Sequence, residues 1–165
     1  MQMLTERLVL RPFTIELIDA AIEGDYSKIN SLGFDSTCEW PEAELLDALP
    51  FFKSLLLENG LDGFNSWIIL NKETFEIMGS LGFIGRPDDD GNVEIGFGVI
   101  PGKRNNGYGY ESVMSLINWA FENSRVNCIL AKCDNSNVQS KSILKKIGFN
   151  ITGNEENLII WELQK

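Results

Sequence analysis

The hydrophobic pattern changes period near residue 64 and again near residue 101, and this double change constrains the fold more than any other feature. Three short β-type segments separated by polar turns come first, at residues 66–70, 77–84 and 93–100. A loop, a helix, a strand and a second helix follow, at residues 101–108, 109–123, 128–133 and 137–147. Antiparallel strands followed by helix, strand and helix predict a mixed, mostly antiparallel α+β sheet.

Both ends of the chain extend this sheet. Residues 7–13 alternate as a strand, and a helix capped by Thr14 follows them. A second helix begins after Pro41, and Pro50 inside it predicts a kink or two shorter helices. Two short strands are expected near residues 150–152 and 158–163. The result is one domain over residues 1–165, with about six to seven strands flanked by about four helices.

The chain contains no histidine. This absence excludes nucleophilic triads that depend on imidazole, histidine-ligated zinc sites and imidazole acid–base catalysis. The three cysteines, Cys38, Cys128 and Cys133, form no Cys-x-x-Cys motif, so we expect reduced thiols and no metal site. Proton transfer must therefore use carboxylates, hydroxyls, thiols, amines or water.

Net charge and hydropathy limit the partners. Fourteen Lys and Arg against 24 Asp and Glu give a net charge of −10. We expect no nucleic-acid partner, because binding to nucleic acid depends mainly on a basic face. No segment has the apolar length of a signal peptide or a membrane span, so we expect a cytoplasmic protein with no membrane partner.

The strand at residues 93–99 has one face almost without side chains. Its odd-numbered residues are apolar, whereas the opposite face carries Glu94, Gly96 and Gly98. Alternate glycines weaken a strand, which makes sense where a ligand must lie against the backbone. A β-bulge or a helix packed closely on the glycines remains an alternative, as does a solvated strand-end charge for Glu94.

The loop after this strand has the composition of an anion site. Lys103 and Arg104 precede Gly107 and Gly109 at a strand-to-helix junction, where backbone N–H groups and the helix dipole favour negative charge. A P-loop is excluded because no Gly-Lys-Ser/Thr precedes the helix, and a Rossmann glycine would follow the strand more directly. Arg-x-x-Gly-x-Gly at residues 104–109 matches fully, although such a loop is also compatible with a simple turn.

These motifs resemble the GNAT acyl-CoA-dependent N-acetyltransferases, in the branch similar to the ribosomal-protein alanine N-acetyltransferases. Three segments carry the resemblance, at residues 5–13, 93–111 and 137–149. It implies a single-domain GNAT-like fold in which strands 93–100 and 128–133 splay apart to admit the pantetheine arm of acetyl-CoA. The cofactor-binding residues that it implies are Val99, Ile100, Arg104, Asn105, Asn106, Gly107, Tyr108, Gly109, Tyr110 and Asn137.

We expect direct attack of an amine on the thioester, because the chain offers no convincing nucleophile for a covalent intermediate. Glu94 would take the amine proton, directly or through water, and Ser140 would interact with the leaving thiolate because Leu144 stands where many relatives have tyrosine. Asn137 is equally well interpreted as a helix N-cap, and Ser140 as bonding to its own helix. Glu111 is expected in the first turn of its helix, where the helix dipole stabilises a negative charge, and Lys103 or Arg104 is expected to pair with it.

The acceptor expected is a small-molecule or peptide amine, including a protein N-terminus, and a homodimer is left open. Two other functions remain from the sequence alone. One is a noncatalytic acyl-CoA-binding module, and the other is a nucleotide-binding regulator.

Overall fold

The computed structural model describes residues 1–165 and contains one eight-stranded sheet of order β1-β2-β3-β4-β5-β6-β8-β7. The strands are β1 (Met3–Leu4), β2 (Leu8–Pro12), β3 (Ser66–Asn71), β4 (Ile77–Phe83), β5 (Asn92–Val99), β6 (Cys128–Asp134), β7 (Asn150–Glu155) and β8 (Leu158–Gln164). Every neighbouring pair is antiparallel except β5 and β6, which are parallel. The expected mixed, mostly antiparallel α+β class is confirmed.

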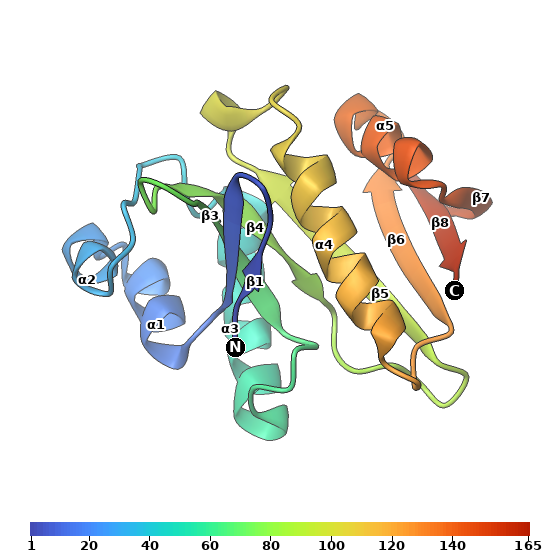
Figure 1. Ribbon diagram of the computed structural model, residues 1–165, viewed down its shortest axis with the longest axis horizontal. Helices are drawn as coiled ribbons and strands as arrows, with labels where there is room; N and C mark the ends of the chain where they lie inside the picture. The colour runs from blue at the N-terminus through green and yellow to red at the C-terminus, as the bar shows by residue number, and fades with distance from the viewer.

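Helices cover both faces of the sheet (Figure 1). They are α1 (Ile15–Glu23), α2 (Tyr26–Ser31), α3 (Ala43–Asn59), α4 (Tyr108–Glu122) and α5 (Val138–Ile147), with a 3₁₀ turn at Pro101–Lys103. One buried apolar cluster lies between the sheet and α4, and a second lies between the opposite face and helices α1 and α3. Burial of these two clusters is the main stabilising contribution, because apolar surface removed from water lowers the free energy of the folded state.

Three details differ from the sequence-based expectation. Strand β1 and helix α2 were not predicted, because elements of two and six residues are too short to show a period. The prediction of two shorter helices around Pro50 is wrong, since α3 is one continuous helix. Pro50 is exposed, and so is Leu46 one turn earlier, so the carbonyl that loses its helical partner is able to bond to water.

The sheet opens at its centre. The ladder between β5 and β6 runs only from Asn92 opposite Cys128 to Ile95 opposite Ala131. Beyond this point β5 continues to pair with β4, whereas β6 continues to pair with β8. The expected parting of these two strands is therefore confirmed, and it leaves a gap between their carboxyl ends.

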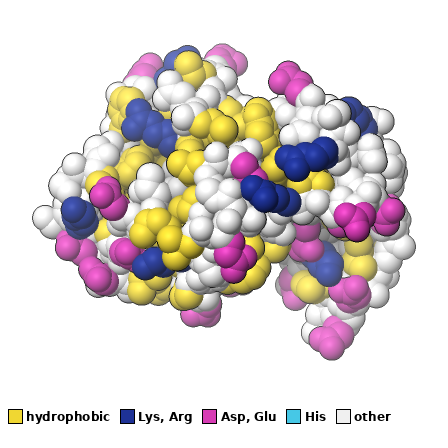
Figure 2. Space-filling view, turned by 90° about the horizontal axis from the view of Figure 1, so that it is seen from below, with side chains coloured by type: hydrophobic (Ala, Val, Ile, Leu, Met, Phe, Trp, Pro, Cys, Tyr) yellow, Lys and Arg dark blue, Asp and Glu magenta, His cyan; other side chains and the backbone are white.

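The surface carries both signs of charge. On the face shown in Figure 2, basic and acidic side chains are interspersed around a broad hydrophobic area, with no basic patch. None of the helices combines the length and the apolar character that crossing a bilayer requires.

Candidate active site

A cleft of about 1220 Å³ lies where β5 and β6 part. One wall is the first part of α3, and the other is formed by the start of α4 and by α5, with β4 and β5 between them. Ligand pockets for small molecules usually measure about 300–1,000 Å³, so this cleft has room for two reactants.

The two glycines on the bare face of β5 have different surroundings. A Cβ added to Gly96 would meet no atom within 4 Å, so nothing in the protein packs on this position. A Cβ at Gly98 would stand 2.8 Å from a carboxylate oxygen of Glu42, which reaches over the strand from the residue before α3. β5 pairs with β4 without a register shift, so the β-bulge alternative is wrong. The alternative of a closely packed helix is wrong for Gly96, whereas Gly98 is covered by one side chain.

The loop before α4 presents a series of unpaired backbone donors. The N–H groups of six successive residues, 105–110, make no hydrogen bond within the protein. Asn105 and Gly107 have positive φ angles of 63° and 82°, which curve the backbone. The Asn106 side chain fixes this curve by donating to the carbonyls of Lys103 and Arg104 at 3.2 and 2.9 Å. A curved run of free N–H groups at a helix N-terminus is an arrangement to which phosphates and other anions commonly bind.

The two cations that the sequence placed beside this loop are both paired. Lys103 bonds to Glu76 at 2.8 Å, while Arg104 bonds to Glu42 at 2.6 Å and to the Val99 carbonyl at 2.8 Å. Attraction for an anion therefore comes first from the backbone rather than from these side chains.

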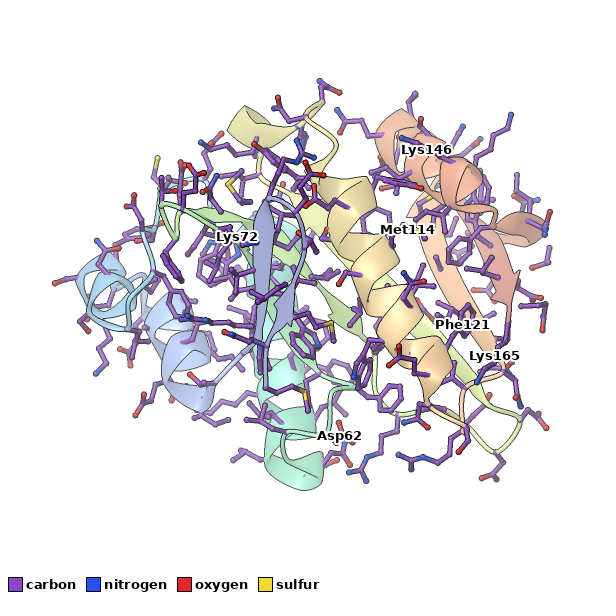
Figure 3. The ribbon with its side chains drawn as sticks, in the orientation of Figure 1. Asp62, Lys72, Met114, Phe121, Lys146 and Lys165 are labelled. Atoms are coloured by element: carbon purple, nitrogen blue, oxygen red, sulfur yellow. The ribbon has the colours of Figure 1, made fainter.

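Lys146 is a cation of the cleft to which the sequence analysis gave no role. Its ammonium lies 4.1 Å from the centre of the Tyr110 ring, between α5 and α4, and it makes no ion pair (Figure 3). The residue belongs to the motif at 137–149, but only the three-dimensional structure shows that its side chain faces the cleft.

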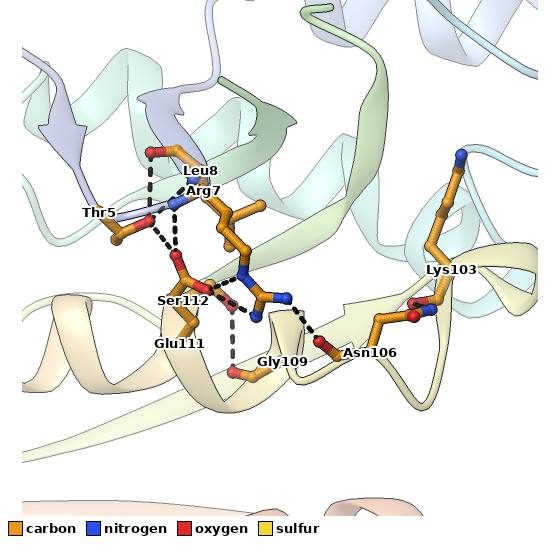
Figure 4. Close-up of polar contacts among 8 residues, drawn as sticks. All are labelled: Thr5, Arg7, Leu8, Lys103, Asn106, Gly109, Glu111 and Ser112. Carbon is orange, nitrogen blue, oxygen red and sulfur yellow. Dashed lines mark hydrogen bonds and ion pairs between the residues drawn. The ribbon is translucent and has the colours of Figure 1, made fainter. Parts of the chain in front are cut away.

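A polar cluster attaches the N-terminal segment to the start of α4 (Figure 4). Glu111 accepts hydrogen bonds from the Thr5 hydroxyl at 2.6 Å and from the backbone N–H and Nε of Arg7, each at 2.8 Å. Arg7 also donates to the Asn106 carbonyl at 2.9 Å. The partner of Glu111 is thus Arg7, and the expectation of Lys103 or Arg104 is wrong because both are held by other carboxylates.

The pKa of Glu111 lies below its usual range. Burial alone would raise it, but the hydrogen bonds from Thr5 and Arg7 and the charge of Arg7 outweigh that effect. A depressed folded-state pKa means that this cluster stabilises the fold above the unfolded-state pKa of about 4.3, and that the contribution is lost as pH falls through the folded value.

Replacement of Glu111 by glutamine should therefore lower the free energy of unfolding by about 1–2 kcal/mol at pH 7, because the part-buried Thr5 hydroxyl and the exposed donors of Arg7 lose a charged acceptor. The deficit should shrink as the pH falls below about 4. Urea unfolding over this pH range tests the prediction, with Glu122→Gln on the same helix as the control. Glu122 has no ion pair, so it should change stability by less than about 0.5 kcal/mol. A pH-independent difference for Glu111→Gln would contradict the assignment.

Most of the predicted cofactor residues line the cleft, and so does Ser140. The cofactor residues that do not line it are Ile100 and Asn106, and the predicted catalytic residue Glu94 does not line it either. Ile100 is buried, and its N–H and carbonyl bond to Met78 and Lys103 within the protein. Asn106 lies beside the cleft and shapes its loop.

Glu94 is half-buried in the last part of β5 that pairs with β6, two residues before Gly96. Its charge acts on Lys132, whose pKa is raised first by the hydrogen bond to Glu155 and then by the charge of Glu94. Glu94 thus lies on the face that carries the two glycines, two positions along the strand from Gly96, and it does not line the cleft.

Asn137 caps α5, so its interpretation as a helix N-cap is confirmed. Its side-chain oxygen accepts the N–H of Ser140 at 3.0 Å, and the Asn137 residue lines the cleft as well. Ser140 is half-buried, and its hydroxyl makes no hydrogen bond within the protein, so the alternative that it bonds to its own helix is wrong. Leu144 is fully buried in the apolar cluster beneath α4, which explains why an apolar residue stands at this position.

Comparisons with known proteins agree with this architecture. A family profile described as an acetyltransferase (GNAT) domain matches residues 7–150. An uncharacterized N-acetyltransferase, YjdG of Bacillus subtilis (strain 168), is 42% identical over 146 residues, which cover 88% of this chain and 87% of that protein.

Solved structures share the fold. RimL, described as a ribosomal L7/L12 alpha-N-protein acetyltransferase in complex with coenzyme A, has a TM-score of 0.70 at 15% identity and covers 97% of this chain and 95% of its own. A ribosomal-protein-S5-alanine acetyltransferase from Vibrio fischeri has a TM-score of 0.71 at 14% identity, with 99% and 96% coverage.

The curated relatives are N-acetyltransferases, which supports an enzyme rather than a noncatalytic acyl-CoA-binding module or a nucleotide-binding regulator. The profile extends over most of the chain, and its match includes β5, the loop before α4 and α5. The chain therefore belongs to the GNAT family of acetyltransferases.

Proposed function

We propose that this enzyme transfers the acetyl group of acetyl-CoA to a primary amine by direct attack on the thioester, and that the amine is a protein N-terminus. The observation that carries the proposal is the run of six free N–H groups beside the gap in the sheet. The free N–H groups would suit a diphosphate, and the gap between β5 and β6 would suit an extended amide-bearing arm, because such an arm can pair with a strand edge.

The residues present fit coenzyme A along the whole cleft. The loop 104–109 would bind the diphosphate, and Lys146 would add a positive charge at the mouth. The edge of β5 between Gly96 and Val99 has no strand partner on the side of the gap, and apart from the Val99 carbonyl, which Arg104 holds, it would pair with the amides of the arm. Bound acetyl-CoA supplies the thioester carbonyl that the amine attacks.

Proton transfer has to use the few polar groups near Gly96. An alkylammonium has a pKa of about 10, so the acceptor must lose a proton before it attacks. Glu94 is our proposed proton acceptor, and because it does not itself line the cleft, it would take the proton through water. The free hydroxyl of Ser140, at the start of α5, would hydrogen-bond to the departing sulfur.

A protein N-terminus is favoured as acceptor by two features. The structural neighbours include enzymes named for ribosomal-protein N-terminal and alanine acetylation. On the α3 side the cleft is lined by two carboxylates, Glu42, which pairs with Arg104, and Glu44, which has no ion pair, so negative charge exceeds positive charge there. An acidic entrance favours a positively charged amine.

Two measurements test the proposal. Coenzyme A at 100 times its Kd should stabilise the protein by about 2.7 kcal/mol, visible as a rise in Tm, whereas ATP and NAD should give smaller shifts. Acetyl-CoA with a peptide bearing a free N-terminus should release thiol, and the same peptide with a blocked N-terminus should not. Absence of a Tm shift with coenzyme A would overturn the cofactor assignment, and equal thiol release from both peptides would overturn the acceptor.

A further inference from the structure

The carboxylate of Glu42 is held in a fixed position on the acceptor side of the cleft. One oxygen accepts a hydrogen bond from Arg104, which is itself bound to the Val99 carbonyl. The other oxygen lies above Gly98 and makes no hydrogen bond within the protein. A carboxylate that is oriented through one oxygen and free at the other is ready to accept a hydrogen bond from an ammonium group.

The hydroxyl of Ser80 lies on the strand next to this carboxylate. Ser80 is directly opposite Gly98 in the β4–β5 ladder, and its oxygen accepts the indole N–H of buried Trp40 at 2.8 Å. No group in the protein accepts the Ser80 hydroxyl proton. Ser80 is therefore a free donor next to a free acceptor, and this pair matches an α-amino group followed by the carbonyl of its own residue.

An apolar wall continues from Glu42 along α3. Leu45, Ala48 and Phe52 line the cleft at helical spacing, and Ile84 at the end of β4 lines it as well. Between them the cleft is lined by the small residues Ser66 and Gly82, and the backbone of Asn65 and Ser66 packs closely on Gly82, so the apolar surface comes from α3 and Ile84. Ile84 is 43% exposed, so apolar surface here stays in contact with water until a ligand covers it.

We infer that the acceptor site selects a peptide N-terminus whose first residue has an apolar side chain; this inference rests on the proposed function. Glu42 binds the ammonium, Ser80 donates to the first carbonyl, and Phe52 with Ile84 covers the side chain. A polyamine offers no carbonyl to Ser80, and an aminoglycoside would place hydroxyl groups against the apolar wall. One carboxylate, one hydroxyl and an apolar surface instead match one end of a peptide.

Two peptides that differ only in their first residue, leucine or asparagine, test this inference because these side chains have similar shapes. Wild-type enzyme should acetylate the leucine peptide with a kcat/KM at least 10-fold higher, as expected for one buried apolar side chain. Phe52→Ala should reduce this preference below about 3-fold through the KM of the leucine peptide, while Phe52→Leu should retain it. Leu57→Ala is the matched control, because Leu57 is exposed on the same helix and does not line the cleft.

Glu42→Gln tests the ammonium site. It should raise the KM of both peptides about 10-fold and leave the Kd of coenzyme A within 2-fold, because glutamine still accepts from Arg104 but replaces the free oxygen by a donor. Glu58→Gln, at the far end of α3 and outside the cleft, should leave the KM unchanged. Equal efficiency for the two peptides, or an unchanged KM in Glu42→Gln, would overturn this inference alone. Absence of turnover with either peptide and with every simple amine would overturn the proposed function itself.

Discussion

Replacement of Gly96 by valine is expected to lower the rate of acetyl transfer by at least about 100-fold while the protein stays as stable as the wild type, or becomes more stable. A misplacement of about 1 Å between reacting groups is enough to cause a loss of this size. The valine side chain would enter the part of the cleft where the amine and the thioester have to meet. Stability should rise by about 0.5–1 kcal/mol, because a Cβ here meets no atom within 4 Å and glycine is unfavourable inside a strand.

Gly153→Val is the matched control for this experiment. Gly153 lies in the edge strand β7, outside the cleft, and its added Cβ would meet only Ile160 at an ordinary distance of 3.5 Å. This variant should keep full activity. Thiol release and thermal unfolding measure the two effects. A stable Gly96→Val enzyme with normal turnover would show that the reaction takes place elsewhere.

Glu94→Gln should reduce kcat by about 10²–10⁴, the usual contribution of a positioned proton acceptor, and should leave coenzyme A affinity within about 2-fold. Glutamine has the size and polarity of glutamate but takes no proton at neutral pH. Steady-state kinetics and a Tm titration with coenzyme A separate the loss of turnover from any loss of binding.

Glu155→Gln is the control for the charge of Glu94. Both carboxylates act on Lys132, but Glu155 lies on β7 at the sheet edge. If Glu94 serves only to balance Lys132, the two variants should have similar kinetics. If it takes the proton of the amine, only Glu94→Gln should lose turnover. A kcat for Glu94→Gln within 3-fold of wild type would reject this role.

The sequence predicted the fold well where elements are long and periodic. The strands from Ser66 to Val99 and the helices α4 and α5 appear at the expected positions, because alternation and helical spacing directly reflect which face is buried. β1 and α2 escaped prediction because their few residues depend on tertiary contacts, such as the ladder between β1 and β2.

The shape of the anion-binding loop was also predictable, since its glycines mark where the backbone needs unusual freedom. The partners of its charged residues were not. Arg7 and Glu111 are 104 positions apart, and Arg104 and Glu42 are 62 apart, so no local spacing connects them. The sequence shows which charged residues lie near the loop, but only the fold shows which oppositely charged side chain each of them pairs with.

The short ladder of paired residues between β5 and β6 also has a consequence for motion. Four residue pairs join the strands on either side of the gap, so the segment that contains β6, β7, β8 and α5 is joined to β5 by few backbone hydrogen bonds. Such a segment is expected to open transiently as a unit, and its backbone amides should exchange hydrogen with solvent faster than those of β3 and β4. A molecule hydrogen-bonded to the edges of both β5 and β6 would replace the absent hydrogen bonds between these strands, and it would slow amide exchange in both strands.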